Sequence, residues 1–204
     1  MVTAEVRWPG ENSTQRAGVH GHVKICQKDA QSLTKFSVCM SGLKPRHLHG
    51  FHIHTNPVTS WADLNTSCAS CGGHFNPTNQ EHGSVFNHYP RLRHVGDLIN
   101  NIRSDGFGRA RVDFWDDMAC LIPTRDKPYT IIGKSLVIHQ GTDDLGRQGR
   151  SPNLPYVDSK NIIYHGTDES EVEAYSDEET RELSLQTGNA GARLACGNIL
   201  PLEC

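Results

Sequence analysis

Residues 33–40 read LTKFSVCM, and their apolar side chains fall on every second position, at Phe36, Val38 and Met40. This period of two is typical of a half-buried β-strand. The stretch AGVHGHVKIC at residues 17–26 repeats the pattern, and Gly, Pro, Asn and Asp separate further short stretches of the same kind. We expect strands at Val2–Trp8, Ala17–Cys26, Leu33–Met40, Gly50–His54, Val95–Ile99, Gly108–Phe114, Lys134–Gln140 and Ala192–Ile199. No segment before residue 165 has convincing helical periodicity. The sequence therefore predicts an all-β fold, an eight-stranded antiparallel Greek-key barrel or sandwich.

The length, net charge and apolar content of the chain limit the classes of protein to which it can belong. The chain has 204 residues, which suits a single domain over 1–204, and its net charge is −3. That balance argues against a nucleic-acid partner, and no apolar run approaches the ~20 residues that span a bilayer, so we expect no membrane partner. The N-terminus lacks the basic start and apolar stretch of a signal peptide. We therefore expect a cytoplasmic protein.

Two segments lack the alternation of apolar and polar residues that marks the expected strands. His54 to Asp97 is rich in Gly, Asn, Pro and His, and a loop of that length inside a domain is usually functional or disordered. Gly141 to Thr187 is the second, and residues 168–182 within it hold eight acidic residues against one arginine. We interpret about 147–182 as a solvated acidic insertion or partly ordered loop. A separate protein-interaction role for it stays open.

Histidines gather around the first of these segments. His52 and His54 stand at i and i+2 of an expected strand, so both imidazoles project to one side and can reach one metal ion. The loop then supplies further candidates that match the four tetrahedral N/O ligands of zinc, namely His74, His82, His94 and Asp97. His139 ends a later apolar strand. One such histidine could be a surface or capping residue, but six together predict a metal site.

The ordered motifs GFHIH (50–54), GHFNP (73–77), HG (82–83), RHVGD (93–97), LVIH (136–139) and GNAGARLACG (188–197) resemble the copper/zinc superoxide dismutases. The resemblance covers roughly residues 17–200. It implies the Greek-key barrel with long zinc-binding and electrostatic loops. It also implies an oxidoreductase that converts two superoxide anions to oxygen and hydrogen peroxide by alternate reduction and oxidation of copper.

The resemblance also implies a role for each candidate. Copper would be bound by His52, His54, His74 and His139, and zinc by His74, His82, His94 and Asp97. His74 would bridge the two metals and take part in proton transfer. Asp143 would orient His52 and His82, and Arg193 would dock the superoxide anion beside copper.

The resemblance further implies a disulfide between Cys68 and Cys196, although a cysteine in the cytosol is usually a free thiol. Cys71 creates the sequence Cys68-Ala-Ser-Cys71, and such a C-x-x-C pair can be redox-active. No thioredoxin-like βαβ pattern surrounds it.

The sequence differs from the family pattern in the residues expected along the path by which superoxide reaches the copper site. Gln186 stands where the family usually has a lysine, and the nearby insertion is acidic, so we expect weaker electrostatic steering of superoxide. A homodimer is expected, and whether a copper chaperone loads the site stays open. The alternative function is a non-enzymatic copper/zinc-binding protein of the same fold.

Overall fold

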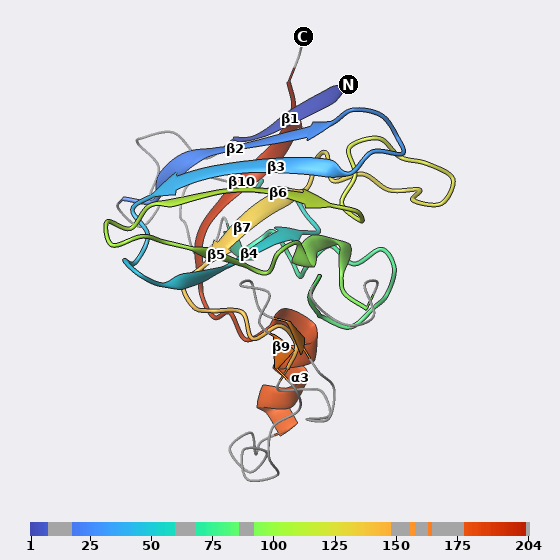
Figure 1. Ribbon diagram of the computed structural model, residues 1–204. Helices are drawn as coiled ribbons and strands as arrows, with labels where there is room; N and C mark the ends of the chain where they lie inside the picture. The colour runs from blue at the N-terminus through green and yellow to red at the C-terminus, as the bar shows by residue number, and fades with distance from the viewer. Residues whose placement is uncertain are drawn as a thin grey trace.

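An eight-stranded antiparallel sheet, curled into a barrel, forms the body of the protein (Figure 1). The computed structural model describes residues 1–7, 18–59, 68–85, 92–147, 156–157, 163–164 and 178–202. Within them the elements are β1 (Val2–Arg7), β2 (His20–Gln27), β3 (Thr34–Ser41), β4 (Leu48–His54), η1 (Val95–Asp97), β5 (Asn101–Arg103), β6 (Ala110–Asp116), β7 (Ser135–His139), β8 (Tyr156–Val157), β9 (Ile163–Tyr164), α3 (Glu178–Thr187) and β10 (Arg193–Pro201).

The strand order shows how the barrel is connected. It runs β5-β4-β7-β10-β1-β2-β3-β6, and the two edge strands β5 and β6 contact each other, which nearly closes the barrel. β3 and β4 follow one another in the chain but lie far apart in this order, as a Greek-key connection requires. The predicted eight-stranded antiparallel fold is confirmed.

The alternation that predicts β3 has the expected packing. Phe36, Val38 and Met40 are buried, and the residues between them are half-buried on the outer face. The rings of Phe36 and Phe114, on neighbouring strands, stack with their centroids 4.8 Å apart. The apolar interior therefore fills the barrel and holds β4 and β7, the two strands that carry histidines, in fixed register: Phe51 pairs with Ile138, and His54 with Ser135.

One predicted strand is wrong. Val95–Ile99 contains the 3-10 turn η1, and the strand β5 begins only at Asn101. The carboxylate of Asp97 accepts a hydrogen bond from the backbone N–H of His94 at 2.8 Å, which closes the turn. Gly96 packs so tightly that a Cβ there would lie 2.1 Å from the carbonyl oxygen of Ile53. The turn thus brings His94 and Asp97 to the same point, which an extended strand would not do.

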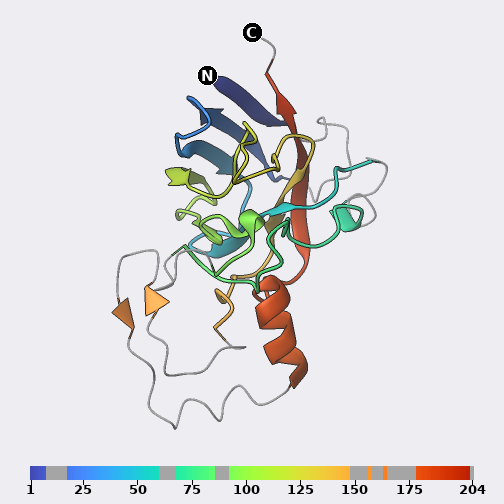
Figure 2. The same cartoon turned by 90° about the vertical axis from the view of Figure 1, so that its right-hand side faces the viewer.

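The helix α3 was not predicted. It lies at one end of the barrel, away from the end where β1 begins and β10 finishes (Figures 1 and 2). Glu178 and Glu179 stand in its first turn, where acidic side chains complement the helix dipole. Most of the predicted insertion at 147–182 lies outside the described residues, so its extent and the single-domain assignment stay predictions. No helix in the described part of the chain is long and apolar enough to cross a membrane.

Candidate metal centre

Four buried histidines from three parts of the chain meet at one point. His52 and His54 come from β4, His139 ends β7, and His74 follows in the long loop, where it forms an isolated bridge with His54. One nitrogen from each ring lies within 4.8 Å of the others, and Nε2 of His54 is 3.3 Å from Nε2 of His139. The side-by-side placement of His52 and His54 expected from the strand period is thus present.

Their hydrogen bonds fix which nitrogen faces the centre. Nδ1 of His54 lies 2.8 Å from the carbonyl oxygen of Gly72, and Nδ1 of His139 lies 2.9 Å from that of Gly191. A carbonyl can only accept, so each Nδ1 carries the proton and each Nε2 keeps a lone pair for the centre. His52 has the opposite arrangement, because its Nε2 lies 2.5 Å from the carboxylate of Asp143.

Ring nitrogens that are not engaged in hydrogen bonds are the ones available to bind a metal. Nδ1 of His52 and Nε2 of His74 are buried and have no hydrogen-bond partner among the described residues. A buried polar atom without a partner costs free energy, and such groups in native proteins call for an explanation. Imidazole nitrogens suit copper and zinc alike. The donor set therefore fits a transition-metal ion.

A second cluster shares His74 with the first. Oδ1 of Asp97 lies 2.9 Å from Nδ1 of His74, 2.9 Å from Nδ1 of His82 and 3.0 Å from Nδ1 of His94. Three imidazole nitrogens and one carboxylate oxygen, all buried, are a ligand set that zinc accepts in tetrahedral geometry. His74 presents Nδ1 to this cluster, which leaves Nε2 for the first.

The carboxylate of Asp143 accepts hydrogen bonds from one histidine of each cluster. Its Oδ2 contacts Nε2 of His52, and its Oδ1 lies 3.0 Å from Nε2 of His82. Asn101 holds the aspartate in place: its side chain accepts a hydrogen bond from the backbone N–H of Asp143 and donates one to the backbone carbonyl, both at 2.9 Å. A carboxylate that accepts a ring proton fixes the tautomer and orientation of a metal-binding histidine.

The surroundings of the two clusters favour neutral imidazoles in the first cluster and ionised carboxylates at Asp97 and Asp143. Burial lowers the pKa of His139 to about 3 and holds the pKa values of His54 and His74 well below the ordinary value. Burial alone would raise the pKa of Asp97 and of Asp143, but the charge of His82 and hydrogen bonds from histidines outweigh it and lower both. Burial likewise opposes the charge on His82, yet the two aspartates raise its pKa to about 10. A positive charge at the second cluster therefore stabilises the two buried carboxylates, and a metal cation would supply such a charge.

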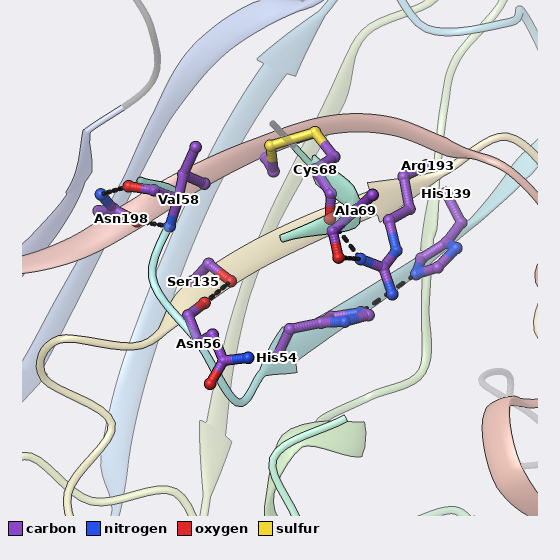
Figure 3. Close-up of a disulfide and its surroundings, with 10 residues drawn as sticks. His54, Asn56, Val58, Cys68, Ala69, Ser135, His139, Arg193 and Asn198 are labelled. Atoms are coloured by element: carbon purple, nitrogen blue, oxygen red, sulfur yellow. Dashed lines mark hydrogen bonds between the residues drawn. A yellow bond between two sulfur atoms is a disulfide. The ribbon is translucent and has the colours of Figure 1, made fainter. Parts of the chain in front are cut away.

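Arg193 lies at the start of β10 beside the first cluster (Figure 3). Its guanidinium donates hydrogen bonds to the carbonyl oxygens of Cys68, Ala69 and Gly72, with 3.2 Å to Ala69. Gly72 is also the carbonyl that accepts from His54, so one loop segment orients both the arginine and a histidine. Cys68 and Cys196 are joined by a disulfide with their Cα atoms 5.7 Å apart, which ties this segment to β10.

The structure brings all the predicted site residues together, and it adds groups that the sequence did not indicate. These are the carbonyls of Gly72 and Gly191, the side chain of Asn101, and the buried Arg93, which pairs with Asp116 at 2.8 Å and donates to the carbonyl of His94. Backbone carbonyls carry no sequence signal. Arg93 directly precedes His94 in the motif, but nothing in its spacing pairs it with Asp116.

Comparison with known proteins agrees with this geometry. Residues 19–167 match the family described as copper/zinc superoxide dismutase. The chain is 36% identical over 184 residues to an extracellular superoxide dismutase [Cu-Zn] of Onchocerca volvulus, covering 90% of this chain and 70% of that protein. It is 35% identical to the superoxide dismutases [Cu-Zn] of Candida glabrata and Saccharomyces cerevisiae over 183 residues, 90% of both chains in each case. The chain therefore belongs to the copper/zinc superoxide dismutase family.

Proposed function

We propose that this chain dismutates superoxide, with copper held by His52, His54, His74 and His139 and zinc held by His74, His82, His94 and Asp97. The observation that carries the proposal is the sharing of His74. Its Nδ1 lies in the cluster around Asp97, while its buried Nε2 has no hydrogen-bond partner among the described residues. Bound copper would supply reversible one-electron chemistry that takes an electron from one superoxide and returns it to another.

His74 has the chemistry that the proton transfer requires. A neutral imidazole has one lone pair, so a ring that binds two cations must lose its second proton, and the metal charges make this possible. Nε2 of His74, which faces the first cluster, would take up a proton and later give it to the reduced substrate. Asp97 and the rest of the second cluster would hold the ring in place through Nδ1 during this exchange.

Arg193 is the proposed docking group for the anion. A guanidinium keeps its charge and presents several donors in a plane. The three carbonyls that accept its hydrogen bonds all belong to the segment from Cys68 to Gly72, so the side chain is oriented before substrate arrives. Because docking donors that are positioned in advance need no reorganisation, this arrangement favours rapid capture of a small anion.

The alternative is a protein of this fold that binds copper and zinc without catalysis. Such a relative is expected to lack a copper ligand or the anion-docking arginine. Here the four histidines and Arg193 are all in place, which supports the enzyme. The homodimer, a copper chaperone and the cytoplasmic location stay predictions, and the relatives include an extracellular form.

The variant His139→Ala tests the proposal, with His22→Ala as its control because His22 is an exposed histidine on β2. His139 belongs only to the first cluster. We expect His139→Ala to keep zinc and to lose both copper and dismutase activity, and His22→Ala to keep all three. Full activity in purified His139→Ala would contradict the assignment of copper to this cluster.

A further inference from the structure

Three cysteines meet in one buried cluster next to the metal centre. Cys68 and Cys196 form the disulfide, and Cys71 packs with them among Val58 and Val137. Cys71 carries a thiol, and its side chain is fully buried, with 0% exposed. A thiol is thus enclosed in the same small apolar cluster as a disulfide.

Cys68 and Cys71 are also neighbours along the chain. They stand at i and i+3 of one turn, in which the backbone N–H of Cys71 donates to the carbonyl of Cys68 at 3.2 Å. In helical geometry the Cα atoms of residues three apart lie about 5 Å from each other. Disulfides join cysteines whose Cα atoms are about 4.4–6.8 Å apart, so a local adjustment of this turn allows the two to bond.

We propose that Cys71 is a second disulfide partner for Cys68, and that the bridge moves between Cys68–Cys196 and Cys68–Cys71 by thiol–disulfide exchange. The Cys71 thiolate attacks Sγ of Cys68, a new Cys68–Cys71 bond forms and the Cys68–Cys196 bond breaks. Cys196 leaves as a thiolate and takes up the proton that Cys71 lost. One disulfide is present before and after, so the step consumes no oxidant or reductant.

The packing of the folded state keeps this exchange slow. Burial raises the pKa of the Cys71 thiol, although a hydrogen bond with Ser135 and the charge of Arg193 partly oppose the effect. Backbone hydrogen bonds hold the segment closed, from Asn56 N–H to the carbonyl of Cys71 and from Thr55 N–H to that of Gly73, each 2.9 Å. Exchange therefore requires local opening of this segment, because only the thiolate attacks a disulfide.

Moving the bridge would release a covalent restraint on the metal centre. In the Cys68–Cys196 form, the segment that carries the carbonyl partners of Arg193 is tied to β10, the strand on which Arg193 itself lies. In the Cys68–Cys71 form only hydrogen bonds and apolar packing would hold the two together. We expect the exchanged form to dock superoxide less well. This consequence rests on the proposed function, whereas the exchange itself does not.

Disulfide mapping of the folded, metal-loaded protein tests the exchange. The protein is kept at about pH 8.5, near the ordinary pKa of a cysteine thiol, quenched with acid at intervals, alkylated and cut with trypsin. Cys68 and Cys71 fall in one tryptic peptide, 47–91, and Cys196 falls in another, 194–204. The Cys68–Cys196 form gives the two peptides linked. The exchanged form gives peptide 47–91 closed on itself and peptide 194–204 with Cys196 alkylated.

We expect the exchanged form to accumulate with time in the unmodified chain and in the control Cys120→Ala, which removes another buried thiol. Cys71→Ala should show several-fold less alkylation of Cys196. The proposal is overturned if Cys196 stays linked to Cys68 at all times in the folded protein, or if Cys196 is released equally in Cys71→Ala. Because the readout is a linkage and not activity, failure of the exchange and failure of the proposed dismutase function are distinguishable.

Discussion

Asp143 offers the sharpest test of how the two metal sites are coupled. Its two carboxylate oxygens accept from one histidine of each cluster, Nε2 of His52 at 2.5 Å and Nε2 of His82 at 3.0 Å. Asparagine has nearly the same shape but only one accepting oxygen, and its amide N–H would face the second ring N–H. In Asp143→Asn, one of two fully buried imidazoles therefore loses its acceptor.

The expected size of the effect follows from that lost contact. A buried donor without a partner costs about 1–3 kcal/mol. Loss of a carboxylate behind a metal-binding histidine typically costs about 10–100-fold in metal affinity, which corresponds to about 1.4–2.7 kcal/mol. We expect Asp143→Asn to weaken zinc and copper binding by a factor in this range. Competition with a chromophoric chelator measures each affinity.

The neighbouring carboxylate is a matched control. Asp144 accepts hydrogen bonds from Ser184 and Asn189, both at 2.9 Å, and within the described residues its side chain is not hydrogen-bonded to any of the seven candidate ligands. Asp144→Asn should therefore retain metal affinity. The reasoning is refuted if Asp143→Asn binds both metals as tightly as the unmodified chain, or if Asp144→Asn weakens them by the same factor.

Three further outcomes are expected. Arg193→Ala should lower kcat/KM by the equivalent of about 1.5–3 kcal/mol, the value of a hydrogen bond to a charged group, with metal content unchanged and partial recovery in Arg193→Lys; a full rate in Arg193→Ala would contradict docking by this side chain. Replacing both Cys68 and Cys196 by serine should lower the free energy of unfolding by about 5 kcal/mol in the chain-entropy model, because the bond spans a sequence separation of 128, and an unchanged denaturation midpoint would contradict this. Gln186 is exposed on α3, so Gln186→Lys should raise the rate at low salt and Gln186→Glu should lower it, with the difference fading near 0.1 M salt, where the screening length is about 10 Å; equal rates for both variants at low salt would show that this position does not steer superoxide.

Strands and ligands could be predicted for physical reasons that the structure makes visible. A half-buried strand shows its period in the sequence, and Phe36, Val38 and Met40 all point inward as that period requires. His52 and His54 could be placed on one side of a strand by the same rule. The long loop also indicates His74, His82, His94 and Asp97 as zinc-like ligands, but only the resemblance implies that the ligands divide between two metals and that His74 belongs to both.

The features that were missed depend on contacts between distant segments. The turn at Val95–Asp97 forms because Asp97 binds the backbone of its own segment and that of Gly83, and this hydrogen bonding competes with strand geometry. The carbonyls of Gly72 and Gly191 orient histidines without any side chain that could signal it. The role of Asn101 likewise depends on Asp143, 42 residues away.

The central claim is that one histidine, His74, joins a copper site and a zinc site in a working dismutase. Metal analysis of the purified protein, coupled to a superoxide dismutation assay across samples loaded with increasing copper, tests it most directly. The account predicts one copper and one zinc per chain at saturation, and activity that rises in proportion to bound copper. Full activity in a copper-free sample, or no activity in a fully loaded one, would contradict it.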